Sequence, residues 1–318
     1  MTSERVPSGG HRSSGVPSDV LRDVASVVAP GTSPGSLTAS RIGGGCISPA
    51  AQLDVPDGAP VFLKWSREPG LTGFGVEARG LEALRSRRAL RVPEVLGFTQ
   101  GEPGQRGWLA LEFIESGRVG PTTDERLGHG LARLHRPIPG AEPGWEEDGW
   151  IGSFPQRNRL PGSVGPSWPT FWRDARLLPQ WRLASGRFES RTKRLWDRLL
   201  DRLDDALRGR ENDGLSMLHG DLWSGNVLVD VSGEPVLLDP ALYRGHREVD
   251  IAMMELFGGF STAALEAYRE RAPLGAGYAS IRSDVYQLYP LLVHVNLFGG
   301  GYVAGVRARV ERLLAELG

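Results

Sequence analysis

Three polar residues in the last third of the chain have the types and the spacing that phosphoryl transfer requires. In the segment HGDLWSGN, residues 219–226, Asp221 and Asn226 lie five positions apart on a polar stretch that leads into an apolar run. Asp239 follows eighteen positions after Asp221, at the end of the next apolar run. The reaction needs a carboxylate that takes the proton of an acceptor hydroxyl and oxygen ligands that hold Mg²⁺ on the phosphates. The spacing therefore predicts Asp221 as the base and Asn226 and Asp239 as metal ligands.

A second set of residues, in the first third of the chain, could bind the nucleotide. Gly43, Gly44 and Gly45 can form a flexible hairpin over the phosphates, and Lys64 lies in the apolar run VFLKW, from which its ammonium can reach them. Glu77, in the following helical segment, can hold Lys64 as an ion pair. The chain has 35 Arg and only two Lys, so this lysine indicates a site that needs a compact ammonium. The backbone groups expected to bind adenine belong to Glu112, Phe113 and Ile114.

Two kinds of structure must position these residues, and the apolar periodicity predicts both. After a disordered tail at 1–17, the N-terminal lobe, 18–114, is expected to hold two helices, the first capped by Ser18, and five antiparallel strands. The helices are expected at 18–30 and 73–90, and the strands at 36–42, 46–55, 61–65, 92–99 and 107–114. The fold class is therefore α+β, with a small sheet-containing lobe followed by a larger lobe.

The larger lobe, 115–318, is expected to be mainly helical, with the Asp221 loop and two short strands inserted between helices. Its helices are expected at 124–136, 168–180, 187–207, 263–271, 281–298 and 305–317, and its strands at 227–231 and 235–238. A tryptophan-rich stretch, 140–169, is too long and too aromatic for a plain linker. It is expected to pack on this lobe or to line a site.

Composition excludes several other classes of function. The 318 residues carry a net charge of -1, which leaves no basic field for nucleic acid or an anionic membrane. The single cysteine, Cys46, excludes an internal disulfide framework and multi-cysteine metal sites. With no run of 18 apolar residues and no apolar leader, this cysteine count favours the cytoplasm. The GTSPG segment, 31–35, has proline directly after its serine and cannot form a nucleophile elbow, and no P-loop occurs.

Several blocks of the sequence resemble one family. LHGDLWSGNVLVD, with Trp223 two residues after Asp221, and GHREVD are similar to the fructosamine kinase (ketosamine-3-kinase) family, within the aminoglycoside-phosphotransferase-like and protein-kinase-like superfamily. GGGCI, VFLK, LARLHR, IGSFPQRN and NLFGGGY resemble further family blocks in the family's order, over about residues 43–302. The resemblance implies a bilobal protein-kinase-like fold, ATP and Mg²⁺, and phosphorylation of the 3-hydroxyl of a ketosamine, the glycation adduct of an amine. It also links Cys46 to a redox-dependent homodimer.

Several neighbours of these motifs have two interpretations each. Trp223 could stack on a sugar ring or pack in the core. His294, with Asn296, could contact the substrate or could be a satisfied helical histidine. Cys46 could be a redox site or an inert small residue. The residues expected to brace the catalytic loop are Asp250, His246 and Arg247.

Two other functions fit parts of the sequence. An aminoglycoside or other small-alcohol phosphotransferase would want an acidic pocket, for which Glu146, Glu147 and Asp148 are the candidates. An ATP-binding pseudokinase scaffold would lack at least one of the four central residues, and all are present: Lys64, Asp221, Asn226 and Asp239. A ketosamine 3-kinase, acting on fructosamine- or ribulosamine-type adducts, is the main hypothesis.

Overall fold

The structure, a computed structural model, describes residues 15–43, 48–160, 165–208 and 213–318. It divides into two compact units, one formed by Met1–Phe74 and Val95–Phe113 and the other by Gly75–Glu94 and Ile114–Gly318. The segment Gly75–Glu94, which the sequence placed in the N-terminal lobe, thus groups with the second unit. Its Gly80 packs against Pro240 and Leu242, which explains the grouping.

A five-stranded antiparallel sheet forms the centre of the first unit. The strand order is β1 (Thr38–Arg41), β2 (Ala50–Asp54), β3 (Val61–Trp65), β5 (Trp108–Glu112) and β4 (Val95–Thr99). In this register Lys64 of β3 lies opposite Ala50 of β2 and Leu109 of β5. The expected antiparallel sheet is confirmed.

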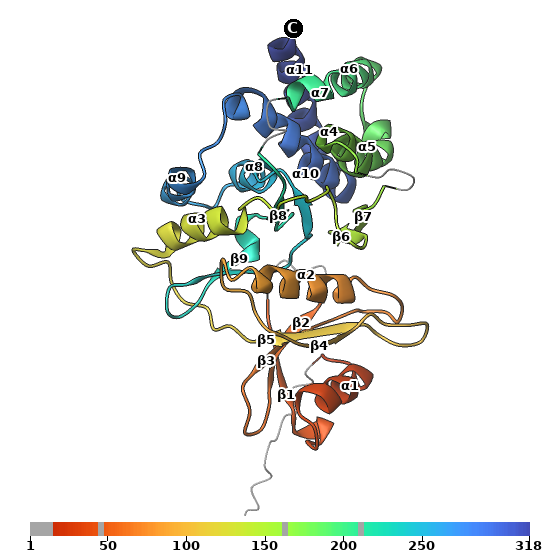
Figure 1. Cartoon of the computed structure of the whole chain (residues 1–318). Helices are drawn as coiled ribbons and strands as arrows, with labels where there is room; N and C mark the ends of the chain where they lie inside the picture. The colour runs from red at the N-terminus through yellow and green to blue at the C-terminus, as the bar shows by residue number, and fades with distance from the viewer. Residues whose placement is uncertain (1–14, 44–47, 161–164, 209–212) are drawn as a thin grey trace, which may run out of the picture. The chain divides into compact units, whose positions relative to one another are not determined.

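Helix α1 (Ser18–Val28) packs on this sheet near β4 and β5 (Figure 1). Val20 and Val24 are buried with Leu53 and Leu63 of the sheet. The expected N-cap at Ser18 is wrong, because Pro17 occupies that position and no side chain caps the helix. Val16 is also buried in this core, so the expected disordered tail at 1–17 cannot extend to residue 17. Residues 1–14 of that tail lie outside the described residues.

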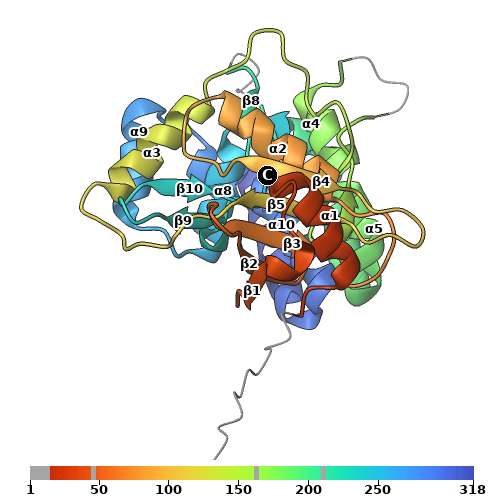
Figure 2. The same cartoon turned by 90° about the horizontal axis from the view of Figure 1, so that it is seen from below.

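The second unit is mainly helical, as expected. Its helices are α2 (Phe74–Ser86), α3 (Thr123–Leu134), α4 (Trp168–Phe171), α5 (Leu178–Ala184), α6 (Ser190–Asp201), α7 (Leu203–Ala206), α8 (Glu248–Phe257), α9 (Thr262–Arg271), α10 (Ser283–Phe298) and α11 (Val303–Leu317). Two π-helical segments, Trp172–Leu177 and Tyr278–Arg282, lead into α5 and α10. Helices α3 and α9 lie side by side in both views (Figures 1 and 2). None of the helices in the described part of the chain is long and apolar enough to span a membrane.

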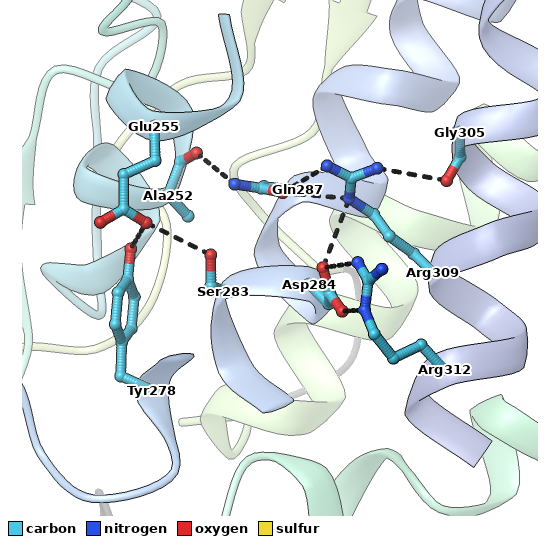
Figure 3. Close-up of polar contacts among 9 residues, drawn as sticks. All are labelled: Ala252, Glu255, Tyr278, Ser283, Asp284, Gln287, Gly305, Arg309 and Arg312. Carbon is cyan, nitrogen blue, oxygen red and sulfur yellow. Dashed lines mark hydrogen bonds and ion pairs between the residues drawn. The ribbon is translucent and has the colours of Figure 1, made fainter. Parts of the chain in front are cut away.

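Polar side chains join α8, α10 and α11 beside the apolar core (Figure 3). Asp284 of α10 accepts hydrogen bonds from Arg312 of α11 at 2.5 and 2.6 Å. Gln287 of α10 accepts from Arg309 of α11 at 2.6 and 3.0 Å and donates to the carbonyl of Ala252 on α8 at 3.0 Å. The C-terminal helices are therefore tied directly to α8, the helix that follows the predicted catalytic segment.

Three short antiparallel strand pairs complete this unit. They are β6 (Gly149–Ile151) with β7 (Phe154–Gln156), β8 (Ser216–Leu218) with β11 (Tyr243–Gly245), and β9 (Val227–Val229) with β10 (Pro235–Leu237). The sequence predicted only β9 and β10. The tryptophan-rich stretch does pack on this unit, since Ile151, Gln156 and Asn158 are buried there.

Candidate active site

The segment that contains Asp221 is a tight loop between β8 and β9. Gly220 has φ +81°, and a side chain there would bring Cβ to 2.1 Å from the carbonyl oxygen of Ala241. Only glycine fits both conditions. His219 is fully buried, lies with Nε2 2.8 Å from the carbonyl of Leu238, and accepts the amide proton of Asp221 on Nδ1 at 3.3 Å. The loop is thereby tied to the chain just before Asp239.

Asp250, in the first turn of α8, holds the loop from behind. Its Oδ2 accepts from the amide of His219 at 2.7 Å and its Oδ1 from the amide of Gly220 at 2.9 Å. His135 Nε2 lies 3.1 Å from Oδ2. Burial alone would raise the pKa of this carboxyl, but the hydrogen bond from His135 and those from the loop lower it overall. The expected bracing role of Asp250 is confirmed.

The carboxylate of Asp221 is held by the side chain of Asn226. Asn226 Nδ2 donates to Asp221 Oδ2 at 3.1 Å and to its backbone carbonyl at 2.9 Å. Burial raises the pKa of Asp221 to about 7, the nearby charges of Asp239 and Asp250 act in the same direction, and the Asn226 hydrogen bond opposes them. A carboxyl with a pKa near neutrality is suited to accept a proton.

Asp239 follows β10 with φ +51°, an unusual backbone conformation for a residue before proline. The amide of Leu238 donates to the carbonyl of Asn226 at 2.9 Å, so the residues before and after the β9–β10 hairpin are joined. The carboxylate of Asp239 and the side-chain amide oxygen of Asn226 are oxygen donors of the kind that bind Mg²⁺, with phosphates and water as its other ligands. Nowhere among the described residues, this loop included, does a group of three His, Cys, Asp or Glu side chains lie together as metal ligands.

Trp223 lies at the surface of the loop. Its side chain is 39% exposed, and its ring covers Gly225, where a Cβ would come within 2.1 Å of it. The tryptophan is therefore not part of the core, and part of its side chain is accessible for contact.

His294 lies on α10 within a group of aromatic side chains. Its ring is 4.5 Å from Phe257, 4.9 Å from Tyr302 and 5.3 Å from Phe298, measured between centroids. Nδ1 lies 2.8 Å from the carbonyl of Pro290, and burial lowers the pKa of the ring. The amide nitrogen of Asn296, by contrast, donates to the backbone and side chain of Gln180, an arrangement that serves the structure.

The residues expected to bind ATP belong mostly to the first unit. Lys64 is 4% exposed on β3, Glu112 ends β5, and Phe113 and Ile114 follow that strand. Glu77 lies on α2, which groups with the second unit. Gly43 is exposed, whereas Gly44, Gly45 and Cys46 lie outside the described residues. The roles of these residues and the Lys64–Glu77 pair stay predictions.

The three acids of the tryptophan-rich stretch are bound within the chain. Glu147 accepts from Arg79 at 2.5 and 2.6 Å, and Glu146 accepts from Arg244 at 2.8 Å. Asp148 accepts from the backbone amides of Asn158 and Arg159 at 2.7 and 3.2 Å. Each of the three carboxylates is thus bound to partners within the chain.

Several buried polar residues that support the loop were missed by sequence reasoning. Gln156 donates to the carbonyl of Ala241 at 3.0 Å and accepts from Tyr289 at 2.9 Å. Arg176 is fully buried, stacks 3.9 Å from the ring centroid of Tyr243, and donates to Asn158 at 2.7 Å. The block IGSFPQRN was a signal for Gln156 and Asn158, but nothing in the sequence shows that Arg176 is among the few of the 35 arginines that are buried.

A cavity of about 610 Å³ lies elsewhere in the second unit, away from the catalytic loop. Three of its four guanidinium groups are engaged by the chain: Arg126 pairs with Glu234 at 2.5 Å, Arg91 pairs with Asp230, and Arg133 donates to the carbonyl of Ala89. It contains none of the predicted site residues.

Comparison with known proteins gives a consistent family assignment. The family model for fructosamine kinase matches residues 25–316. A probable ketoamine kinase of Synechocystis sp. is 38% identical over 276 residues, which cover 86% of this chain and 89% of that protein. A chloroplastic protein-ribulosamine 3-kinase of Arabidopsis thaliana is 36% identical over 281 residues, covering 87% of this chain and 82% of that one.

The fold agrees with this assignment. The crystal structure of a protein assigned as a fructosamine-3-kinase from Thermobifida fusca superimposes with a TM-score of 0.80 and 33% identity, over 94% of this chain and all of that one. The expected α+β, protein-kinase-like architecture is thereby confirmed. With a family model that spans nearly the whole chain and relatives of this similarity, the chain belongs to the fructosamine kinase family.

Proposed function

We propose that this enzyme transfers the γ-phosphoryl group of ATP to the 3-hydroxyl of a ketosamine. The observation that carries the proposal is the catalytic loop, in which Asn226 holds the Asp221 carboxylate at 3.1 Å and Asp239 lies close enough for its charge to act on Asp221. The relatives named ketoamine kinase and protein-ribulosamine 3-kinase support this class of acceptor.

In the proposed reaction, Asp221 takes the proton of the 3-hydroxyl as its oxygen attacks the γ-phosphorus. The bond from that phosphorus to the β,γ-bridging oxygen breaks, and ADP leaves with the electron pair. The raised pKa of Asp221, about 7, suits a base that must be unprotonated before the step and protonated after it. The hydrogen bond from Asn226 keeps the carboxylate in one orientation.

The remaining groups serve the nucleotide. Asn226 and Asp239 would hold Mg²⁺, which neutralises charge on the β- and γ-phosphates. Lys64 would bind the phosphates, supported by Glu77, under a cover formed by Gly43, Gly44 and Gly45. The adenine contacts are assigned to Glu112, Phe113 and Ile114.

For the acceptor, Trp223 and His294 are the proposed contacts. The half-exposed indole of Trp223 follows the base by two residues and can stack on the apolar face of a sugar. The carbonyl of Pro290 accepts the Nδ1 proton of His294, which leaves Nε2 as an acceptor for a substrate hydroxyl. The lowered pKa keeps this ring neutral near pH 7.

A ketosamine is favoured over an aminoglycoside because of the charges around the loop. A polycationic antibiotic needs several carboxylates, and Glu146, Glu147 and Asp148 are engaged by partners within the chain. A ketosamine has one sugar and one amine, for which the two proposed neutral contacts, Trp223 and His294, are enough.

The cysteine count bears on the cellular compartment in which the reaction would take place. A single cysteine fits a reducing compartment such as the cytoplasm. There the partner would be a small ketosamine or a glycated protein amine. The redox-dependent homodimer through Cys46 stays a prediction alongside a monomeric enzyme.

The test is an assay of ADP release with fructosamine, ribulosamine and erythrulosamine derivatives, run beside aminoglycosides. We expect Mg²⁺-dependent turnover of at least one ketosamine, with the phosphate found on the 3-oxygen by ³¹P and ¹³C NMR. Asp221→Asn should reduce kcat by at least about 10²-fold while nucleotide affinity changes little, since it removes only the base. Faster turnover of an aminoglycoside than of every ketosamine would overturn the proposal.

A further inference from the structure

A series of buried hydrogen bonds connects Arg247, just before α8, with the catalytic loop. Arg247 Nη1 donates to Tyr268 Oη at 3.1 Å, and that oxygen lies 3.0 Å from His135 Nδ1. His135 Nε2 lies 3.1 Å from Asp250 Oδ2, and Asp250 accepts both amide protons of the loop before Asp221. Tyr268, His135 and Asp250 are at most 1% exposed, so water cannot replace a missing partner.

The direction of these hydrogen bonds follows from Arg247. A guanidinium can only donate, so the oxygen of Tyr268 accepts from it, and the hydroxyl proton is left for the other partner of this buried oxygen, His135 Nδ1. Burial raises the pKa of Tyr268 to about 12, which keeps that proton in place. The proton of the imidazole is therefore on Nε2, where it faces the carboxylate of Asp250.

The opposite arrangement would disturb the loop. With the imidazole proton on Nδ1, three hydrogens would meet at Tyr268 Oη, and the lone pair of Nε2 would face the carboxylate of Asp250. Asp250 would lose one of its donors and gain a repulsive neighbour in a site of low dielectric constant. Its hold on the amides of His219 and Gly220 would weaken, and the position of Asp221 with it.

We propose that Arg247 and Tyr268 are positioning residues for phosphoryl transfer, which fix the proton of His135 and thereby hold the catalytic loop through Asp250. The effect on rate rests on the kinase function proposed above. Arg247 is itself fixed, because it also donates to the carbonyls of Ala272 and Pro273 at 2.8 and 2.5 Å. Its donor to Tyr268 cannot turn away without breaking those bonds.

The direct test compares Tyr268→Phe with Tyr278→Phe. Tyr278 is a matched control, because it is 5% exposed and its hydroxyl donates to Glu255 of the same helix α8 at 2.7 Å, without touching the loop (Figure 3). Tyr268→Phe should lower kcat about tenfold, with the KM values for ATP and ketosamine within about twofold of wild type. Tyr278→Phe should keep the wild-type kcat, although it should lower the unfolding free energy about as much as Tyr268→Phe does.

A second readout needs neither nucleotide nor acceptor. Hydrogen–deuterium exchange of the peptide that covers residues 216–222 reports on the amides bound by Asp250. It should become about tenfold faster in Tyr268→Phe and stay unchanged in Tyr278→Phe. Equal exchange in both variants, at equal unfolding free energy, would overturn the positioning role.

Arg247→Met supplies an independent check. Because Arg247 and Tyr268 act through the same proton, the double variant should show the kcat of Tyr268→Phe alone instead of the product of the two losses. Multiplying losses would contradict the shared path. If wild-type enzyme phosphorylates no ketosamine, the proposed function fails, and the exchange comparison still decides the inference.

Discussion

The two lysines of the chain occupy opposite environments. Lys64 is 4% exposed in β3, between apolar neighbours in a paired strand, whereas Lys193 is exposed on α6. Burial of an ammonium is costly unless the charge is used. The burial of Lys64, together with the scarcity of lysine among 37 basic residues, supports the proposed role of Lys64.

Lys64→Arg should impair catalysis although it keeps the charge. The guanidinium is larger than the ammonium and presents a planar fork, so its donors would miss a site built around a single point charge. We expect kcat/KM to fall roughly 10²-fold, the usual cost of a misplacement of about 1 Å. Lys193→Arg is the matched control and should behave as wild type. Near-normal activity of Lys64→Arg would show that the lysine count is a coincidence.

The sequence singled out the candidate catalytic residues but not the side chains that support them. Asp221, Asn226 and Asp239 could be proposed because phosphoryl transfer requires certain residue types at certain spacings, and the structure brings Asn226 and Asp221 into hydrogen-bond contact. His135 could not be distinguished from the other five histidines. Its role depends on Tyr268, 133 positions away, and a contact of that separation has no local pattern.

At the scale of elements, strand length decided which parts could be predicted. The five strands of the first unit have four or five residues each and were found with their order along the chain. Strands β6, β7, β8 and β11 have three residues each, too few for alternation to be visible, and the equally short β9 and β10 were found only as apolar runs flanked by polar loops. Next to the β8–β11 pair, the backbone of Gly220 lies close to the carbonyl of Ala241. These two residues are far apart in the sequence, so no local pattern predicts the contact.

Asp230 fixes the turn of the β9–β10 hairpin, which Asn226 precedes and Asp239 follows. Its Oδ1 accepts from the hydroxyl and amide of Ser232 at 2.6 and 2.8 Å and from the amide of Glu234 at 3.0 Å. The Ser232 hydroxyl lowers the pKa of Asp230 to about 2 despite burial, and the amides and Arg91 add to the effect. The turn therefore depends on the ionised carboxylate.

Asp230→Asn should lower the unfolding free energy by about 2 kcal/mol at pH 7. Because the folded pKa is depressed, this contribution is complete above the unfolded value of about 3.9 and is lost as the pH falls through about 2. Urea unfolding at pH 7 and pH 3 measures this dependence. The difference in unfolding free energy between wild type and Asp230→Asn should be smaller at pH 3 than at pH 7. The exposed Asp205, which pairs with Arg202 and Arg208, is the control, and Asp205→Asn should change little. A difference that stays constant with pH would contradict the ionised turn.

At the scale of the whole molecule, the predicted division into lobes and the observed division into units differ at one element. Helix α2 follows β3 in the sequence, and its Gly80 packs on Pro240 and Leu242 of the second unit. A sequence pattern shows that a helix is amphipathic but not which neighbour its apolar face meets. Glu77 is therefore on the same unit as Asp239, whereas Lys64 is on the other.

If the predicted nucleotide groups bind ATP, binding should stabilise the folded chain, and the metal should be responsible for part of that effect. With Mg²⁺, ATP at about 100 times its dissociation constant should raise the unfolding free energy by about 2.7 kcal/mol. With EDTA in place of Mg²⁺, the rise should be smaller. Thermal unfolding with ATP, with and without the metal, measures the Mg²⁺-dependent part.

Asp239→Asn should remove that Mg²⁺-dependent part of the stabilisation. Asparagine tolerates the φ of +51° at this position, so the substitution removes the charge without straining the backbone. Asp221→Asn should keep the metal-dependent part, because the base contacts the acceptor hydroxyl and not the metal. If Asp221→Asn loses the metal effect and Asp239→Asn retains it, the two carboxylates have exchanged roles. Loss in both variants would mean that the base and the metal ligand act on one shared ion.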